Sequence, residues 1–593
     1  MYMCGIFGYI GNDNASKVIV RGLKRLEYRG YDSWGIAVAA KHALKIVKRV
    51  GPIGDVKKAL VLPPSTVGLG HTRWATHGRV TYTNAHPHFS TDRSFALAQN
   101  GIVENYKELR KKLLQLGYAF HTETDTEVIV RLIEYEQKRA ISLLDAVRQA
   151  FKQLEGRNTI ALITTEGEII AARNGSPLVV GKNTKNKNLY ISSDTLSFAP
   201  YVDGMYMVDN GQLIRATKSE VSCQDIRTGK SIPMHYEHVS TRHSEVDKAG
   251  FEHFMLKEIH ENPHVISALL KQPAKEYERL AQVIKRARRV YVVGSGTAGI
   301  AAAQIAFYLR EYAHIDAVSL VGADAKEYYD YFTPDDLIIA PSQSGETADV
   351  LEVLEHARIK KAVIASFVNM PGSMISRLSD FAFMAQAGPE ICVMSTKIFV
   401  SQIAWGYLLA KTVANKRTDA LKQLEKLSRD MSTYLEQPES HKQLKQVASV
   451  LVKKHDIFLM GKFQNLQIVR EGMVKFIEGT YKHAHAIPAG DLKHYAITLM
   501  EKGVVVVAAI SRDSVYSDMM NAMHEVKARG ATVIGISADR EEGMDIHIPV
   551  PKEAETSAIM HVVPLQLLAY YMAKKLGNNI DRPRNIAKSV TVK

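Results

Sequence analysis

The sequence predicts an α+β domain followed by two tandem α/β domains, each with a doubly wound parallel sheet. Up to about residue 240, short apolar segments alternate with Gly, Asn and Pro, as strands alternate with turns. Beyond that point apolar strands alternate with helical patterns, which is typical of parallel sheets covered by helices. This second part also repeats internally, and is therefore expected to hold two copies of one fold.

Residues 1–240 are expected to form the first domain. Its helical patterns lie at 15–26 and 125–138. Its strand-like segments lie at 159–164, 169–172 and 177–180. A polar stretch, 238–250, then separates this domain from a helical segment at 251–270.

The internal repeat is visible in the apolar strands. The first copy has strands at 290–294, 336–340 and 362–367, and the second copy has strands at 457–461, 503–507 and 532–537. The first two strands of each copy begin at the same separation. We therefore expect α/β domains at 251–430 and 440–580, followed by a polar tail at 581–593.

Composition indicates an ordinary globular protein, with 593 residues, 46% hydrophobic and 23% charged. The net charge of +14 favours anionic partners such as a phosphorylated small molecule, or simply a lysine-rich surface. Because no long basic run is present, nucleic-acid binding is not expected. The three cysteines form no CxxC pair, and neither a signal peptide nor a membrane-spanning apolar stretch is evident. We expect a cytoplasmic, reducing location.

Cys4 is the first candidate catalytic residue. If cleavage made it the first residue, its thiol would be the nucleophile and its α-amine, with a pKa of roughly 7.7–8.0, the base. Met1 and Tyr2 precede Met3 in the numbered chain, so this interpretation needs translation to start at Met3 or the extra residues to be trimmed. The alternative is a buried apolar cysteine near the end of a strand.

A loop of hydroxyl side chains follows the strand at 336–340. Ser342, Gln343 and Ser344 precede Gly345, Glu346 and Thr347, and a helix is expected from about residue 348. Backbone N–H groups, the helix dipole and Ser/Thr hydroxyls at such a position suit a phosphate group. Helix capping would account for one hydroxyl but not for three. The equivalent loop of the second copy, 509–514, lacks the glycine, so one copy is expected to hold the phosphate.

A competing interpretation comes from the GSGTAG segment at 294–299. It matches the G-x-G-x-x-G pattern of dinucleotide-binding proteins, and Asp316 lies at a suitable distance along the chain for a ribose contact. The pattern is weak by itself and leaves the hydroxyl loop unexplained. The same glycines would equally allow close approach of a sugar phosphate.

Glu471, Lys475 and Glu478 recur at i, i+4 and i+7 in the helix expected at 466–481, and so share one face. A solvated, salt-bridged face would have the same spacing. His494 follows after a loop containing proline and glycine. A glutamate and a histidine brought together by a turn are plausible proton-transfer groups.

Segments spread along the chain form a recognisable set: MCGIFGYIG (3–11), LEYRGYDSWGIA (26–37), HTRWATHG (71–78), NAHPH (84–88), QNGIVEN (99–105), TETDTEV (122–128), SQSGET (342–347) and PRNIAKSVTVK (583–593). With them the chain resembles the glutamine–fructose-6-phosphate amidotransferase (isomerising) family over essentially its whole length. The resemblance implies an N-terminal nucleophile, class II glutaminase domain and two sugar isomerase domains. It also implies a homodimer that needs no cofactor or metal.

The family's glutamine chemistry maps onto the first domain. By resemblance Cys4 attacks the side-chain amide of glutamine, and Asn100 with the backbone of Gly101 forms the oxyanion hole. Arg73 would bind the α-carboxylate of glutamine and Asp125 its α-ammonium. The remaining expected glutamine-site residues are Trp74, which would gate an internal ammonia path, Thr76 and His77.

The family's sugar chemistry maps onto the second part. By resemblance the phosphate of fructose 6-phosphate is held by Thr297, Ser342, Gln343, Ser344 and Thr347. Lys588 would form a Schiff base with the C2 ketone, and Glu478 would move a proton between C1 and C2. Lys475 would balance charge, and His494, supplied by the neighbouring subunit, would assist ring opening. The product would be glucosamine 6-phosphate, the first amino sugar on the route to UDP-N-acetylglucosamine.

Some residues depart from the family pattern. Ala298 stands where a hydroxyl is usual, His485 where an acidic residue is common, and Tyr495-Ala496 where Gly-Pro is usual. These changes keep two alternatives open. One is a glutaminase fused to a unit that aminates or deglycates another sugar phosphate, and the other is a non-catalytic sugar-phosphate sensor.

Overall fold

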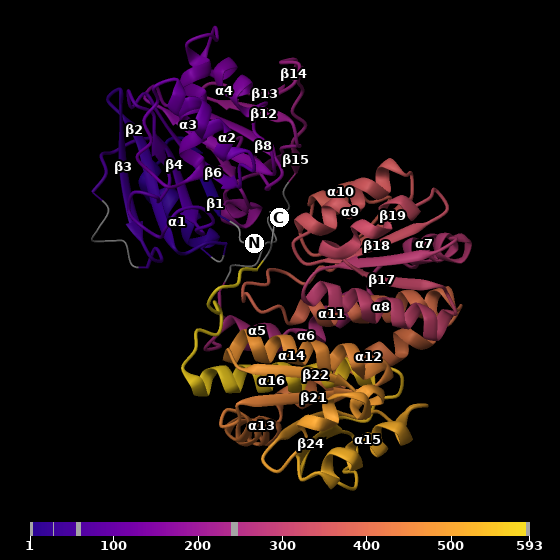
Figure 1. Ribbon diagram of the computed structural model, residues 1–593. Coiled ribbons are helices and arrows are strands. Elements are labelled where there is room, and N and C mark those ends of the chain that lie inside the picture. The colour runs from indigo at the N-terminus through magenta and orange to yellow at the C-terminus, as the bar shows by residue number, and fades with distance from the viewer. Residues whose placement is uncertain (1–3, 28, 55–60, 239–246, 589–593) are drawn as a thin grey trace. The chain divides into compact units, whose positions relative to one another are not determined.

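The computed structural model describes residues 4–27, 29–54, 61–238 and 247–588 (Figure 1). These residues form two compact units, 4–238 and 247–588, here called the N-terminal unit and the C-terminal unit. No helix in the described ranges is long and apolar enough to cross a bilayer. The limits expected for the individual domains stay predictions.

Two antiparallel sheets form the centre of the N-terminal unit. In order across the first sheet lie β15 (Glu237–His238), β11 (Gly204–Met207), β9 (Val179–Lys182), β10 (Leu189–Ser192), β1 (Gly5–Ile10), β4 (Val67–Arg73), β2 (Ser33–Ala40) and β3 (Ala43–Val50). The second sheet contains β14 (Ser231–Ile232), β13 (Val221–Asp225), β12 (Gln212–Ala216), β8 (Ile169–Asn174), β7 (Asn158–Thr164), β6 (Phe95–Gly101) and β5 (His88–Phe89). The helices are α1 (Ala15–Leu26), α2 (Tyr106–Gln115), α3 (Asp125–Gln137) and α4 (Leu143–Phe151).

The alternation of side chains along the strands explains the layers of this unit. In β1, Ile6 belongs to a buried cluster shared by both sheets, whereas its neighbour Phe7 belongs to a cluster with α1. The second sheet is covered on its other side by α2, α3 and α4. Thr124 caps α3, because its hydroxyl accepts the backbone N–H of Glu127. The unit is therefore two sheets packed face to face between helices.

The C-terminal unit contains two parallel sheets of the same size. The first sheet has the order β17 (Ala317–Val321), β16 (Val290–Gly294), β18 (Leu337–Ser342), β19 (Val363–Val368) and β20 (Phe381–Met384). The second has the order β22 (His483–Pro488), β21 (Asp456–Gly461), β23 (Val505–Ala509), β24 (Thr532–Ser537) and β25 (Ile546–Pro549). We call the parts built on these sheets the first and second lobes. The predicted parallel α/β architecture and its internal repeat are confirmed.

Twelve helices of the described chain cover these sheets and connect the lobes. They are α5 (Phe254–His260), α6 (Asn262–Leu270), α7 (Ala274–Arg286), α8 (Thr297–Ala313), α9 (Ala348–Ile359), α10 (Met374–Leu378), α11 (Lys397–Val413), α12 (Arg417–Glu436), α13 (Pro438–Leu451), α14 (Leu466–Thr480), α15 (Tyr516–Ala528) and α16 (Ser557–Leu576).

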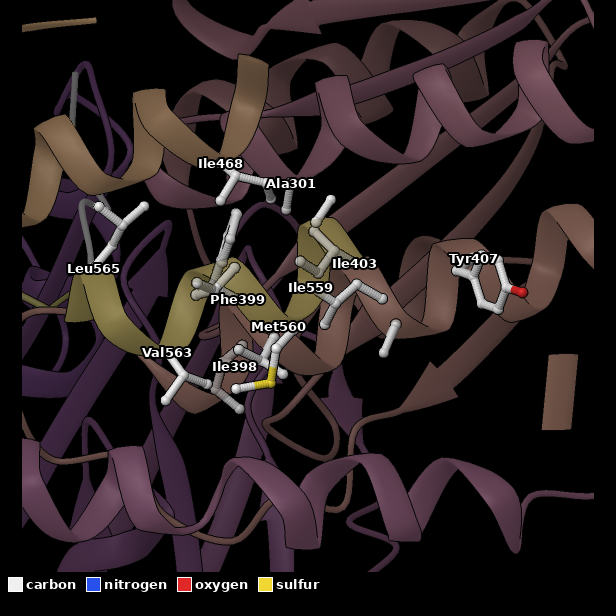
Figure 2. Packing of buried hydrophobic residues seen from close by; sticks show 14 of the residues in the cluster. Ala301, Ile398, Phe399, Ile403, Tyr407, Ile468, Ile559, Met560, Val563 and Leu565 are labelled. Carbon is white, nitrogen blue, oxygen red and sulfur yellow. The ribbon is translucent and has the colours of Figure 1, made fainter. Parts of the chain in front are cut away.

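The two lobes share one apolar core. Figure 2 shows Phe399 and Ile403 of α11 packed with Met560 of α16, close to Ile468 of α14 and Ala301 of α8. Every residue of α11 is buried, so this helix lies inside the shared core. The ends of α8 and α14 are thereby held together, and this positions the candidate sugar site.

Two local expectations need correction. The helical segment expected at 251–270 is divided into α5 and α6, because Pro263 lacks an N–H and starts a new helix. The strand expected at 503–507 is β23, which begins at Val505. Gly503 has a φ of +102°, which belongs to the preceding turn rather than to a strand.

Candidate active sites

Cys4 lies directly before β1, and its side chain is buried. Its sulfur accepts a hydrogen bond from the backbone N–H of Trp74, 3.3 Å away. Burial raises the pKa of the Cys4 thiol to about 11, although the Trp74 N–H and Arg73 act in the opposite direction. The thiol is therefore protonated at neutral pH and needs a base to become a nucleophile. The expected start at Met3 lies outside the described residues.

Ser193 connects the strand after Cys4 to Asn100, the expected oxyanion residue. The Ser193 hydroxyl oxygen accepts the backbone N–H of Ile6 at 2.8 Å and the side-chain amide of Asn100 at 2.7 Å. Ile6 lies in β1 and Asn100 in β6, so this contact joins the two sheets. Burial alone does not single out Cys4, because Cys223 and Cys392 are buried too. What distinguishes Cys4 is its position two residues before Ile6, which Ser193 joins to Asn100.

The backbone and side chain at the end of β6 are both fixed. Gly101 has a φ of +119°, and a Cβ there would lie 2.0 Å from the carbonyl oxygen of Arg157. His71 Nε2 donates to Asn100 Oδ1 at 3.1 Å and to the Gln99 carbonyl at 3.0 Å. Burial lowers the pKa of His71 to about 3, so its ring is neutral. Since both partners are acceptors, the proton lies on Nε2, and the orientation of the Asn100 amide is set.

Arg73 and Asp125, the residues expected to bind glutamine, are both buried in the N-terminal unit. Arg73 Nη2 donates to the His77 carbonyl at 2.5 Å, and Nη1 donates to the Arg79 carbonyl at 3.3 Å. Asp125 Oδ2 accepts the backbone N–H of Val103 at 2.9 Å. Burial lowers the pKa of Arg73 and raises that of Asp125. Neither residue forms an ion pair with another described side chain, so each can take a charged ligand group.

The loop after β4 contains the other residues expected at the glutamine site. The Trp74 ring meets Tyr31 edge-on, with centroids 5.1 Å apart. The His77 ring meets Tyr106, with centroids 4.8 Å apart, and Thr76 is exposed. The sequence expectations for Cys4, Arg73, Trp74 and Asn100 therefore fall on connected strand ends and loops.

The hydroxyl loop lies at the carboxyl end of β18, where α9 begins at Ala348 as predicted. Ser342 Oγ accepts the N–H of Gly345 at 3.0 Å, and Ser344 Oγ accepts the N–H of Glu346 at 3.2 Å. Thr347 is the N-cap residue of α9 but makes no capping hydrogen bond through its side chain. Helix capping therefore does not account for its hydroxyl. Gln343, between the serines, is partly exposed.

Glu471 and Lys475, which are buried, and Glu478, which is partly buried, form a charge cluster on α14. Lys475 Nζ lies 3.4 Å from Glu471 and 2.5 Å from Glu478, and its side chain is 1% exposed. Thr297, the first residue of α8, donates its hydroxyl to Glu471 Oε1 at 3.1 Å. The solvated-face alternative is therefore wrong, since this face meets the first lobe. The cluster joins two predicted sugar-site residues on opposite lobes.

The charges within this cluster are strongly perturbed. Burial raises the pKa of Glu471 to about 7, although Lys475 lowers it. Burial alone would lower the pKa of Lys475, but Glu471 and Glu478 outweigh it and raise that pKa. The other oxygen of Glu471, Oε2, is buried with no hydrogen-bond partner in the described chain.

Lys588 and His494 have opposite environments. Lys588 donates to Glu390 Oε2 in an ion pair whose side chains are 2% and 0% exposed. His494 is exposed at the end of a short 3-10 helix, Ala489–His494. No hydrogen bond or ion pair of the described residues joins Lys588 or His494 to Glu478. Of the tail expected at 581–593, residues 589–593 lie outside the described residues.

Two buried carboxylates were not among the predicted site residues. Glu471 shares the helical face of Lys475 and Glu478, so the spacing carried a signal that could have included it. Glu390 lies in a loop before α11, and nothing in the sequence around it marks it as a partner of Lys588.

The structure excludes the ribose contact that the dinucleotide interpretation needs from Asp316. The glycine-rich segment does lie between β16 and α8, as that pattern requires. However, Asp316 precedes β17, and its carbonyl accepts the N–H of Val290 at the first residue of β16. Asp316 therefore lies at the amino edge of the sheet, opposite the loop, where it pairs with Arg289 at 3.0 Å.

Known protein families match the chain in separate N-terminal and C-terminal parts. Residues 71–199 match the model of the glutamine amidotransferase domain, and residues 283–412 and 450–575 match that of the SIS domain. Curated relatives cover 100% of both chains. They include glutamine–fructose-6-phosphate aminotransferases [isomerizing] of Pyrococcus horikoshii, at 36% identity, and Thermococcus kodakarensis, at 37%.

A solved structure resembles the C-terminal part. It is the C-terminal domain of glucosamine-fructose-6-phosphate aminotransferase from Francisella tularensis, with 28% identity and a TM-score of 0.53. The match covers 57% of this chain and 100% of the solved one.

Proposed function

Because the chain belongs to the glutamine–fructose-6-phosphate aminotransferase [isomerizing] family, we propose that it converts glutamine and fructose 6-phosphate into glutamate and glucosamine 6-phosphate. The N-terminal unit would release ammonia from glutamine. The C-terminal unit would use that ammonia to aminate and isomerise the sugar. We expect this in the reducing cytoplasm, where the Cys4 thiol stays reduced.

In the N-terminal unit, the thiolate of Cys4 attacks the glutamine side-chain amide, and ammonia leaves from the resulting tetrahedral intermediate. The amide of Asn100 and the N–H of Gly101 stabilise the oxyanion. Water then cleaves the thioester to give glutamate. The fork of Arg73 binds the α-carboxylate, and Asp125 binds the α-ammonium. The high pKa of the thiol is the reason that a base is needed, and the α-amine of Cys4 supplies it once residues 1–3 are removed.

In the C-terminal unit, the hydroxyl loop and Thr297 bind the sugar phosphate at the start of a helix. The amine of Lys588 condenses with the C2 ketone and releases water, and ammonia then replaces the lysine. Glu478 moves a proton from C1 to C2, which leaves an amine at C2 and an aldehyde at C1. Lys475 stabilises the negative charge that develops during this transfer.

The chain of contacts from Thr297 through Glu471 and Lys475 to Glu478 supports this proposal best. It connects the helix start that would bind phosphate to the carboxylate that would move the proton. Removing a lysine and its carboxylate partner from water costs free energy, and such perturbed groups cluster at functional sites.

The coupled reaction is tested with protein expressed from Met3, supplied with glutamine and fructose 6-phosphate. Glutamate and glucosamine 6-phosphate are measured together. We expect equal amounts of both. Glutamate without the amino sugar would contradict the proposed sugar reaction while leaving the role of Cys4 intact.

A second function, amination or deglycation of another sugar phosphate, is favoured by one observation. Two departures from the family pattern, His485 and Tyr495, have rings whose centroids lie 6.4 Å apart, and Tyr495 is 47% exposed. The two departures from the family pattern therefore alter the same region of the surface. A panel of phosphorylated ketoses and amino sugars decides between the functions, because a strong preference for another sugar would favour the second.

We also propose that the protein is a homodimer in which His494 serves the partner's sugar site. The exposure of His494 in a single chain supports this arrangement. Mixing His494→Ala and Lys588→Ala variants under conditions that exchange subunits should restore activity, since hybrid dimers would contain one complete site. A mixture as inactive as either variant would contradict the proposal.

A further inference from the structure

Glu390, in the loop before α11, forms an ion pair with Lys588 of the C-terminal tail. The two side chains are 0% and 2% exposed, so neither charge is solvated by bulk water. Burial of this kind is tolerated when the charges neutralise each other and the remaining hydrogen-bonding positions are filled. The ion pair therefore places the Lys588 amine at one fixed point.

The carboxylate of Glu390 is itself fixed by the start of α11. Its Oε1 accepts the backbone N–H groups of Thr396 at 2.9 Å and Ile398 at 3.1 Å, and its Oε2 accepts the hydroxyl of Ser395 at 2.9 Å. Thr396 is the N-cap residue but makes no side-chain cap, so Glu390 takes that place. Burial would raise the pKa of Glu390, yet Lys588 and these donors hold it below its usual range.

A second carboxylate, that of Glu258 in α5, contacts the same loop but has a different role. Its Oε1 accepts the N–H groups of Ile391 at 2.5 Å and Cys392 at 3.2 Å. Burial, followed by the charge of Glu390, raises the pKa of Glu258 to about 8. Glu258 is therefore mainly protonated at neutral pH, and Glu390 carries the negative charge opposite Lys588.

The other charged groups nearby have their own partners. Lys397 pairs with Glu261 at 2.6 Å, and the carboxylate of Asp581 accepts two backbone N–H groups at the start of α5, at 3.1 and 2.9 Å. Cys392 is a buried thiol whose pKa is raised by burial. Glu390 is thus the described carboxylate that contacts the reacting atom of Lys588.

We propose that Glu390 is the proton acceptor for Schiff-base formation by Lys588 and the counter-charge of the resulting iminium. This inference rests on the proposed role of Lys588. The ammonium of Lys588 gives one proton to Glu390, and the neutral amine adds to the C2 ketone. The protonated Glu390 then returns that proton to the carbinolamine hydroxyl, which leaves as water. The iminium carries the positive charge that the ammonium had, and Glu390 is again a carboxylate.

The test traps the iminium with borohydride in the presence of fructose 6-phosphate and no glutamine, and measures modification of Lys588 by peptide mass. Glu390→Gln preserves the shape of the side chain and its acceptor oxygen but removes the charge. We expect it to slow trapping at Lys588 by about 100-fold, the lower range of general acid–base effects. Because hydroxide must then remove the proton, the trapping rate of Glu390→Gln should rise more steeply with pH than the wild-type rate.

Glu258→Gln is the matched control, because it replaces a buried, mainly protonated carboxyl that contacts the same loop with a neutral amide. It should trap at nearly the wild-type rate. Glutaminase activity of each variant reports whether the N-terminal unit is intact, and circular dichroism whether the chain is folded. If Glu390→Gln does not fold, Glu390→Asp, which keeps the charge but shortens the side chain, should fold and trap more slowly.

The outcomes separate the two claims. Trapping at the wild-type rate and with the wild-type pH profile in a folded Glu390→Gln or Glu390→Asp protein would overturn the role of Glu390. Absence of a trapped sugar on Lys588 in the wild-type protein would instead overturn the proposed Schiff base, and the inference with it. Slow trapping in Glu390→Gln with normal trapping in Glu258→Gln supports the inference.

Discussion

The candidate glutamine site and the candidate sugar site hold their charged residues in different ways. Arg73 and Asp125 are buried, but their hydrogen-bond partners are backbone carbonyl and N–H groups, and neither forms an ion pair with another described side chain. Lys475 and Lys588 are equally buried, but carboxylates of the chain pair with them. Glutamine is a zwitterion and brings both missing counter-charges with it. The reacting carbon of a ketose is neutral, so the lysines there need partners supplied by the protein.

From this difference we predict which substitutions weaken ligand binding and which impair the chemical step or the stability of the fold. Removing a charge that awaits a ligand weakens ligand binding, whereas removing one member of an internal pair leaves a buried charge uncompensated. Each of the following variants tests one side of this contrast.

The largest effect is expected for Lys588→Ala. Formation of glucosamine 6-phosphate should fall by more than about 1000-fold, because the covalent step is lost. Glutamate release from glutamine should continue, since Lys588 belongs to the C-terminal unit. Both products are measured in one assay, and amino-sugar formation at the wild-type rate would exclude the Schiff base.

Arg73→Lys should raise the KM for glutamine by about 10- to 100-fold, because the lysine cannot reproduce a two-point contact with a carboxylate. The rate at saturating glutamine should change much less. Steady-state glutaminase kinetics check this, with the KM for fructose 6-phosphate as the internal control. A lowered rate at saturation with an unchanged KM would place Arg73 in the chemical step instead.

Glu471→Gln should change how stability depends on pH. The folded pKa of Glu471 is raised from 4.5 to about 7, so the folded protein retains a proton that the unfolded chain loses. The contribution of Glu471 to the free energy of unfolding is fully present below pH 4.5. It falls by at most about 3 kcal/mol as the pH rises from 4.5 to 7. Unfolding free energies of wild type and variant should therefore converge at low pH and differ in favour of the variant near pH 7. A constant difference across this range would contradict the raised pKa.

The smallest effect is expected at His71. His71→Leu should lower the glutaminase rate by about 10-fold, because the Asn100 amide loses the donor that sets its orientation. His71→Gln, which can still donate, should retain most of the rate. Neither variant should alter the pH profile between pH 5 and 8, since burial keeps the His71 pKa near 3 and the ring neutral throughout.

Much of the fold followed from local sequence signals. The hydroxyl loop correctly predicted that a helix begins at about residue 348, where α9 starts. Apolar runs bounded by turns predicted β16 and β24 at their observed bounds. These elements were predictable because their ends are determined by residues within a few positions.

The environment of the charged residues could not be predicted in that way. The spacing of Glu471, Lys475 and Glu478 indicates one helical face but not whether that face meets water or α8. The partnership of Lys588 with Glu390 joins positions far apart in the chain, and neither belongs to a periodic pattern. The motifs that carried the family resemblance contain Lys588 but not Glu390, so the pair became visible only in the folded chain.

The contrast between the two sites is tested most directly by hydrogen exchange on a matched pair of variants, Lys475→Met and Arg73→Met. Amide protection of α14 in the first and of β4 in the second reports local stability around each lost charge. We predict that Lys475→Met lowers the protection of α14 by about 3–5 kcal/mol, because the buried carboxylate of Glu471 and the partly buried carboxylate of Glu478 lose their partner. Arg73→Met should lower the protection of β4 by no more than about 1 kcal/mol, because Arg73 is ion-paired with no described carboxylate and loses only hydrogen bonds to backbone carbonyls. Equal losses in the two variants would contradict the account.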